Sequence, residues 1–535
     1  MRWISWLLWL LPAYVASGCG PAPASSPPPP LPLDPAILAW EAFQTQWGDS
    51  GQVKVDLWLQ GGSVLDGSGA PAQQADVLVK DQEIIFVGKI LDSVQASQIL
   101  QLDSQLIAPG FIDPHAHGDP VRAPAFQNFL AQGVTTIFLG QDGFSTPTRD
   151  FGGWLERVAA KRPGPNIGSF VGHGTLREMS GVGYRKVPSE AGLNRMKEQL
   201  AAALEAGAFG MSTGLEYTPG TYAEEAELLA LAKVVGSQGG MIMSHMRNED
   251  DDQLLASIDE LLRQGQFCPV HVSHIKSVYG KGQERAEVIL ARLDSARQQG
   301  IVVSADMYPY AASFTGIGIV FPSWAKPPND FSKVRQLKRA QLETYLRQRV
   351  QQRNGPEATL FGTAPYAGKT LAQVANEKGK AFEQVLIEDI GPRGASAAYF
   401  VMDESLQQRL LQDPWVMVCS DGSPTMRHPR GYGSFVKVLE QYARQDSLFS
   451  LAEAVHKMSG LPARILGLAD RGTIEAGNKA DLVVFDPAKV QARASFELPH
   501  RLASGMEWVI VNGQIVKEGE SWTGKRAGQV LRRVK

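Results

Sequence analysis

The chain has 535 residues, of which 44% are hydrophobic and 20% are charged, and it contains three cysteines. This composition excludes a disordered chain, a collagen and a disulfide-stapled scaffold. The 52 basic and 55 acidic residues give a net charge of −3, so the chain as a whole has no attraction for nucleic acid or anionic membranes. A single core rarely grows past roughly 300 residues, and we therefore expect one large domain and a smaller one.

The first 19 residues have the pattern of a secretory signal peptide. Arg2 precedes a short apolar run that ends in the small residues ASG and then Cys19. The run is too short for a stable bilayer-spanning helix, which needs roughly 20 residues. The position of Cys19 resembles the lipid-attachment site of bacterial lipoproteins, although Ala16 stands where most such sites have leucine. We expect Cys19 to be lipidated, with an ordinary signal peptide as the alternative.

Residues 20–35 are rich in proline, which is typical of a stiff, extended tether. These two segments predict an exported protein in the periplasm or on the cell surface, held at the membrane only by its lipid anchor. The remaining cysteines, Cys268 and Cys419, lie in apolar runs, and we expect them to be buried free thiols.

Short alternating strands occupy both ends of the remaining chain. They extend over residues 52–107 and again over 466–525, where Asn512 and Gly513 are a strong signal for a two-residue hairpin. We expect the two ends to pair into one small β domain.

Between these ends, residues 108–465 alternate apolar strands with helical segments such as 189–207 and 223–239. The strand candidates are 106–113, 133–140, 167–174, 208–215, 240–246, 269–275, 301–308 and 415–422. Eight such units predict an α/β protein with a (β/α)8 TIM-like barrel, to which the chain ends add a small β-sandwich domain. The last two strands are about 110 residues apart, which predicts an insertion at about 312–400 able to cover the active-site face.

Polar residues follow several of the predicted strands at the end where such barrels place catalysis. His115 and His117 are two residues apart at the first strand, so both face the same way. His245 ends the fifth strand, His274 the sixth and Asp421 the eighth. Four imidazoles and a carboxylate at one mouth predict a metal site.

The segments APGFIDPHAH, SHMRNE, VSHIK and SDG, with the split β domain, resemble the amidohydrolase superfamily. GMSTGLEYTPG, DMYPYAAS and HPRGYGSF narrow the resemblance to the N-acyl-D-amino-acid deacylase (D-aminoacylase) family, over about residues 52–525. The resemblance implies zinc, for which imidazole and carboxylate ligands are suited. It places His115, His117 and Asp421 at one metal position and His245 and His274 at the other.

The sequence departs from this family at one metal ligand. Better-known members have a cysteine after the second strand, where this chain has Asp142. Two carboxylates are candidates to replace the thiolate: Asp142 itself, and Glu216 after the fourth strand, where other superfamily members place a bridging carboxylated lysine. Glutamate is anionic and long enough to lie between two cations. We therefore favour Glu216 over Asp142 as the bridging ligand, and two zinc ions over one.

The resemblance implies hydrolysis of N-acyl-D-amino acids, or of dipeptides with a C-terminal D-residue, by metal-activated water with Asp421 as general base and then acid. His173 is a weaker candidate for stabilising the oxyanion. The apolar stretch that precedes Lys326 predicts a neutral or apolar D-residue, unless the insertion supplies a charge. The residues expected to contact this small-molecule substrate are Lys276, Tyr308 or Tyr310, Tyr217 and Arg430.

Two other functions remain open. A cyclic-amide hydrolase of the hydantoinase or dihydroorotase type usually carries the modified lysine that this chain lacks. A metal- or ligand-binding lipoprotein without turnover would not require Asp421. The sequence leaves the oligomeric state open.

Overall fold

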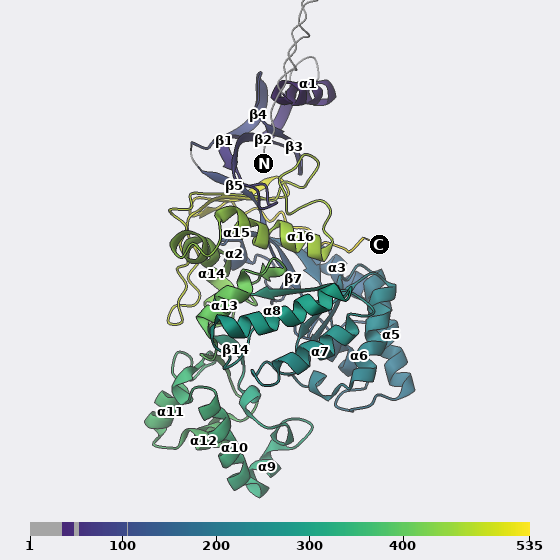
Figure 1. Cartoon of the computed structure of the whole chain (residues 1–535), viewed down its shortest axis with the longest axis vertical. Coiled ribbons are helices and arrows are strands. Elements are labelled where there is room, and N and C mark those ends of the chain that lie inside the picture. The colour runs from purple at the N-terminus through teal and green to yellow at the C-terminus, as the bar shows by residue number, and fades with distance from the viewer. Residues whose placement is uncertain (1–34, 48–52, 104, 535) are drawn as a thin grey trace, which may run out of the picture.

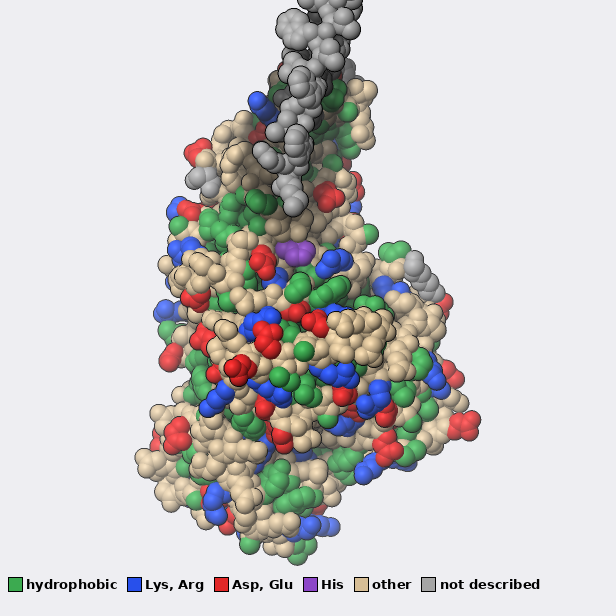
Figure 2. Space-filling model, viewed as in Figure 1, with side chains coloured by type: hydrophobic (Ala, Val, Ile, Leu, Met, Phe, Trp, Pro, Cys, Tyr) green, Lys and Arg blue, Asp and Glu red, His purple; other side chains and the backbone are tan. Residues whose placement is uncertain are grey.

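The computed structural model describes residues 35–47, 53–103 and 105–534 (Figure 1). The expected signal peptide and Cys19, and the tether up to residue 34, lie outside these residues. No helix in the described part of the chain combines the length and the apolarity needed to cross a bilayer. Acidic and basic side chains are interspersed over the face shown in Figure 2, in keeping with the small net charge.

Eight parallel strand positions form a closed barrel, which confirms the predicted fold class. β8 and β9 are separated only by Phe170; β8 pairs with β7 and β9 with β10. A parallel bridge between Ala116 and Gly422 joins the ends of the first and last strands and closes the ring. The strands are β6 (Phe111–Asp113), β7 (Val134–Leu139), β8 (Asn166–Ser169), β9 (Val171–Gly172), β10 (Gly210–Gly214), β11 (Met241–His245), β12 (Val270–Val272), β13 (Val303–Met307) and β17 (Val416–Val418).

Amphipathic helices cover the outside of the barrel. In α5 (Glu190–Glu205), the Ser189 side chain caps the first turn by accepting a hydrogen bond from the Gly192 N–H, and the buried residues include Met196 and Leu200 on one face. This helix and α6 (Glu225–Ser237) confirm the two predicted helical segments. The other helices between or after the barrel strands are α2 (Gln127–Leu130), α3 (Phe151–Ala160), α4 (His173–Met179), α7 (Leu254–Gln264), α8 (Gly282–Gln298), α13 (Glu404–Leu411), α14 (Arg430–Lys437), α15 (Leu451–Met458) and α16 (Gly460–Leu466).

The two ends of the chain combine in one nine-stranded sheet. Its order is β21-β20-β19-β18-β5-β1-β2-β3, with β4 added beside β1, and the two ends meet where β18 pairs antiparallel with β5. Asn512 and Gly513 form the predicted hairpin turn, with φ values of 45° and 75° that suit a type I′ turn. The strands are β1 (Val53–Val64), β2 (Gln73–Lys80), β3 (Glu83–Gly88), β4 (Val94–Gln101), β5 (Leu106–Pro109), β18 (Leu482–Phe485), β19 (Met506–Val511), β20 (Gln514–Glu518) and β21 (Ser521–Trp522).

Helix α1 (Pro35–Trp47) packs on this β domain and was not predicted from the sequence. The rings of Trp40 and Phe43 lie 5.2 and 4.8 Å from the ring of Phe86 in β3. These aromatic contacts fix the chain against the β domain directly after the predicted tether.

A buried carboxylate joins the β domain to the barrel. Asp481 Oδ2 accepts hydrogen bonds from Arg471 (2.5 Å) and from the Asn166 side chain (2.9 Å) at the start of β8. Its Oδ1 accepts the backbone N–H of Asn512 at 2.8 Å. Removing one partner of such a buried ion pair leaves an uncompensated charge, which makes this contact important for the stability of the junction.

Residues 313–402 leave the barrel between β13 and β17 and form a lobe at the end of the molecule away from the β domain (Figure 1). The lobe has its own hydrophobic core. The Tyr222 hydroxyl, from a barrel loop, donates to the carbonyl of Pro327 in the lobe at 2.8 Å. The main elements are β14 (Ser313–Gly316), α9 (Phe331–Leu337), α10 (Arg339–Gln352), β15 (Thr359–Phe361), α11 (Leu371–Lys378), α12 (Phe382–Val385) and β16 (Ser396–Tyr399). Cys268 and Cys419 are buried free thiols, as predicted.

Candidate metal centre

The strand ends bring the predicted ligands together at one mouth of the barrel. His115 and His117 follow β6, Asp142 follows β7, His245 ends β11, His274 follows β12 and Asp421 follows β17. Three of them have positive φ angles, of 56° at Asp142, 37° at His274 and 46° at Asp421. Non-glycine residues seldom adopt this conformation, and it concentrates at functional sites. The backbone is therefore locally strained at three of the residues whose side chains form the centre.

The Asp142 carboxylate lies between the two histidine pairs. Its Oδ1 is 3.2 Å from Nε2 of His115 and 3.2 Å from Nε2 of His274, and its Oδ2 is 3.4 Å from Nε2 of His117. Asp142 therefore belongs to both of the ligand groups that surround it, one with His115, His117 and Asp421 and one with His245 and His274.

Glu216 occupies a different position. Its Oε2 lies 3.2 Å from Nε2 of His245, while Nδ1 of the same ring faces Nε2 of His274 at 3.1 Å. Glu216 thus contacts the far side of one histidine and does not reach His115 or His117 within the ligand groups of this site. This geometry favours Asp142 over Glu216 as the carboxylate shared by both metal positions, the reverse of the preference drawn from the sequence.

Asp421 closes the other side of the centre. Its Oδ1 is 3.1 Å from Nε2 of His117, and its Oδ2 forms an ion pair with Arg430 at 2.9 Å. Burial by itself raises the pKa of the Asp421 carboxyl, but Arg430 and His274 hold it well below its usual value. Asp421 is therefore deprotonated at neutral pH.

The donor set fits a divalent metal. Neither ring nitrogen of His115 has a hydrogen-bond partner among the described residues, although the side chain is fully buried. Burial disfavours the protonated form of His117, yet Asp142 and Asp421 outweigh this effect and raise its pKa to about 9. The negative potential that holds a proton there also attracts a metal cation, and imidazole with carboxylate is a ligand set typical of zinc.

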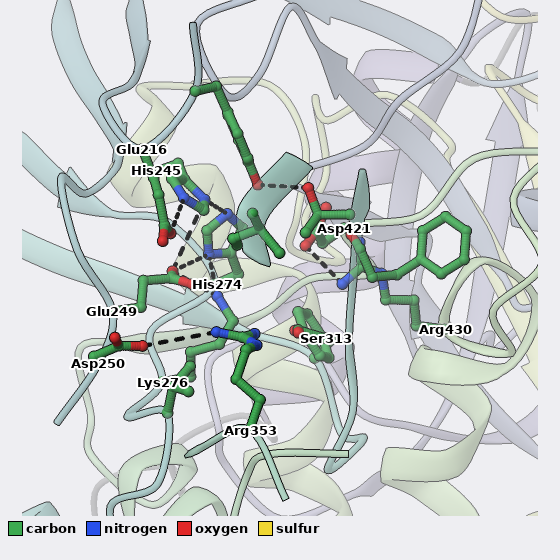
Figure 3. A pocket seen from close by; sticks show the side chains of 16 residues that line it. Glu216, His245, Glu249, Asp250, His274, Lys276, Ser313, Arg353, Asp421 and Arg430 are labelled. Carbon is green, nitrogen blue, oxygen red and sulfur yellow. Dashed lines mark hydrogen bonds and ion pairs between the residues drawn. The ribbon is translucent and has the colours of Figure 1, made fainter. Parts of the chain in front are cut away.

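A cavity opens from this centre towards the insertion lobe (Figure 3). Glu216, His245 and Glu249 lie on one side of it, and Asp421 and Arg430 on the other. The lining comprises Glu216, Tyr217, His245, Glu249, Asp250, His274, Lys276, Val278, Tyr308, Ser313, Phe314, Thr315, Ile319, Arg353, Asp421 and Arg430.

Four of the five predicted substrate-contacting residues, Arg430 among them, line the cavity, and one does not. Tyr217 lines the cavity and stacks on His245 with 4.3 Å between ring centroids. Lys276 and Tyr308 also line it, and Lys276 Nζ is bound to Glu249 at 2.6 Å. Tyr310 is outside the lining, with its ring edge against His428.

His173 is also outside the cavity lining. It is fully buried, and its Nε2 lies 2.7 Å from Glu227, which also pairs with Arg177. This position gives no support to a role in stabilising an oxyanion.

The sequence reading missed three charged residues near the centre. Glu249 lies four residues after His245, and its Oε1 is 3.2 Å from Nδ1 of His274. Asp306 is fully buried in β13, and Arg353 reaches the cavity from the end of α10. The position of Glu249 in SHMRNE and that of Asp306 at the end of the seventh strand were available signals, whereas nothing in the sequence places Arg353 near the site.

Comparisons with known proteins identify relatives of this chain. A model of the amidohydrolase family matches residues 348–517. The chain is 35% identical to N-acyl-D-glutamate deacylase and 33% identical to D-aminoacylase, both from Alcaligenes xylosoxydans xylosoxydans, over 90% and 89% of its length and 97% and 98% of theirs. It also resembles the crystal structure of N-acyl-D-glutamate deacylase from Bordetella bronchiseptica, complexed with zinc and a phosphonate mimic of the tetrahedral intermediate. That match has a TM-score of 0.78 and 34% identity, and it covers 90% of this chain and all of the other.

The fold and the site thus define an amidohydrolase with a TIM-like barrel. Within that class, the chain belongs to the N-acyl-D-amino-acid deacylase, or D-aminoacylase, family.

We expect Asp142→Ala to lose most of the metal of the wild-type protein, because this carboxylate contacts three imidazoles. Glu216→Ala is the matched comparison, since it removes a carboxylate that contacts one imidazole from behind. Its metal affinity should fall by about 10- to 100-fold, which leaves more metal bound than in Asp142→Ala. Elemental analysis of both purified variants measures the difference, and the opposite ranking would restore Glu216 as the shared ligand.

Proposed function

We propose that this chain is a zinc-dependent hydrolase of N-acyl-D-amino acids, and that dipeptides with a C-terminal D-residue are related substrates. The observation that carries the proposal is the pair of histidine groups joined by Asp142 beside a cavity that also contains Asp421 and two arginines. The same family includes an N-acyl-D-glutamate deacylase whose crystal structure contains both zinc and a mimic of the tetrahedral intermediate. When zinc is bound, it supplies Lewis acidity and lowers the pKa of water.

Asp421 is placed to move protons during hydrolysis. Its low pKa leaves the carboxylate free to accept a proton from water at neutral pH, and the protonated acid can then pass it to the departing amine. Arg430 holds one oxygen of the carboxylate, and the other faces His117. This arrangement orients the proton-accepting oxygen towards the metal ligands.

Replacing Asp421 by asparagine keeps the shape of the side chain and removes its ability to accept a proton. We expect kcat to fall by about 10²–10⁴-fold. Zinc content is measured on the same preparation, because Asp421 is also a predicted ligand. Wild-type turnover by Asp421→Asn with its zinc in place would refute the assignment.

Two arginines in the cavity have the chemistry to bind the substrate carboxylate. Arg430 Nε and Arg353 Nε have no hydrogen-bond partner among the residues that the structure describes. Arg353 shares the carboxylate of Asp250 with Arg349, at 3.7 and 2.5 Å, so this cluster has one positive charge in excess. The α-carboxylate common to all N-acyl-D-amino acids supplies the missing negative charge.

The apolar part of the lining supports a neutral D-residue. The stretch after Tyr310 contributes Phe314 and Ile319 to the cavity, and Val278 adds a third apolar side chain. The insertion does supply a positive charge, Arg353, the possibility that the sequence left open. This charge is balanced by Asp250 and by the α-carboxylate of the substrate, so it does not require an acidic D-side chain.

We expect kcat/KM for N-acetyl-D-leucine to exceed that for N-acetyl-L-leucine and for N-acetyl-D-glutamate by at least about tenfold. A panel of N-acetyl-D- and L-amino acids and L,D-dipeptides, assayed with zinc-loaded protein, measures these ratios. A preference for D-glutamate that disappears in Arg353→Met would instead show that Arg353 binds the side-chain carboxylate. Absence of hydrolysis across the panel would favour the metal-binding lipoprotein.

We further propose that the protein is exported and attached to a membrane through a lipid on Cys19. The sequence supports this proposal: a short apolar leader precedes Cys19, and a proline-rich segment separates it from the folded part. The first described helix, α1, then packs on the β domain.

We expect Cys19→Ser to move the protein from the membrane fraction to the soluble fraction of the producing bacterium, because the acyl chains provide the attachment. Fractionation with immunodetection measures the change, and mass spectrometry of the wild-type N-terminal peptide identifies the lipid. An unmodified cysteine in a soluble wild-type protein would contradict the proposal.

A further inference from the structure

A buried carboxylate that is outside the cavity lining connects three histidines behind the metal centre. Asp306, in β13, has no exposed surface. Its Oδ1 accepts the backbone N–H of His274 at 2.5 Å, and its Oδ2 accepts a hydrogen bond from Nε2 of His271 at 2.9 Å. The same Oδ2 lies 3.8 Å from Nδ1 of His115.

These contacts act on two of the predicted ligands in different ways. The bond to the His274 N–H holds this residue at its φ of 37°, the strained conformation that presents Nε2 to Asp142. At His115, a negative charge on the Nδ1 side favours the tautomer with its proton on Nδ1. That tautomer leaves the Nε2 lone pair free for a metal.

A second layer fixes Asp306 itself. The ring of His271 bonds Asp306 through Nε2 and lies 2.7 Å from the hydroxyl of Ser304 through Nδ1. His271 and Ser304 are both buried. The chain of contacts runs from Ser304 through His271 and Asp306 to the backbone of one ligand and the ring of another.

We propose that Asp306 is a positioning residue of the metal centre, which fixes the conformation of His274, favours the metal-binding tautomer of His115 and so raises zinc affinity. His271 and Ser304 keep its carboxylate in place. This inference rests on the zinc site of the proposed function and adds to it a residue that does not touch metal or substrate.

The test compares two isosteric changes of buried aspartates. Asp306→Asn retains an oxygen that can accept the His274 N–H but removes the charge beside His115. Asp481→Asn, at the junction of barrel and β domain, removes an equally buried charge that contacts Asn166, Arg471 and Asn512 and none of the predicted ligands. Zinc affinity is measured by competition with a chromophoric chelator, and thermal stability by calorimetry with and without zinc.

We expect Asp306→Asn to bind zinc about 10- to 100-fold more weakly than wild type. Fully loaded with zinc, it should show a lower kcat at nearly unchanged KM, because the substrate-binding residues are untouched. Asp481→Asn should melt at a lower temperature but bind zinc with wild-type affinity. Wild-type zinc affinity in Asp306→Asn, or an equal loss in both variants, would overturn the proposal.

Ser304→Ala is a milder change for the case that Asp306→Asn does not fold. It frees the ring of His271 to turn away from Asp306, and we expect zinc affinity to fall severalfold without a change in the fold. Wild-type affinity in this variant would overturn the inference on its own. Failure of the wild-type chain to bind zinc would instead refute the metal centre of the proposed function, and this inference with it.

Discussion

The active centre depends on the contact of one carboxylate, Asp142, with imidazoles from opposite sides of the barrel mouth. Buried imidazoles and carboxylates lose hydration, and they recover free energy when they are hydrogen-bonded or paired with an opposite charge. Here Asp142 lies between the histidines. Three further carboxylates, those of Glu216, Glu249 and Asp306, lie behind the histidine rings. This ring of negative charge requires cations at its middle, whether protons or metal ions, and it sets the orientation of each ring.

The same strand ends also close the barrel. Oδ1 of Asp113, at the end of β6, accepts the backbone N–H groups of His115 and Ser420, both at 3.1 Å, and so joins the first strand to the last. The Asp421 N–H donates to the carbonyl of His115 at 2.9 Å. Ligand geometry and barrel closure therefore rest on shared hydrogen bonds, and a change in one disturbs the other.

The barrel could be predicted from the sequence because its strands are short apolar runs with turn signals. The candidate ligands could be located because each lies at the end of such a run. The preference for Asp142 over Glu216 as the shared carboxylate required the structure, because the position of Asp142 in the sequence does not show that it contacts three imidazoles. Arg353 comes from an insertion whose placement depends on tertiary packing. The position of Asp306 near a strand end does not by itself show that its carboxylate contacts His271 and His274. Helix α1 was missed because it follows a proline-rich segment and is stabilised by aromatic contacts with β3.

The pairing of β18 with β5 has a consequence for how this protein acquires its structure. The sheet next to α1 is complete only when strands from the two ends of the chain meet, with the whole barrel between them. Contacts so distant in sequence form late, because closing long loops costs entropy before the strands can pair. During synthesis, β1 to β5 can pair with one another, but β5 lacks its second partner, β18, until the last segment has been made. The β domain therefore cannot be completed before the last residues of the chain are available.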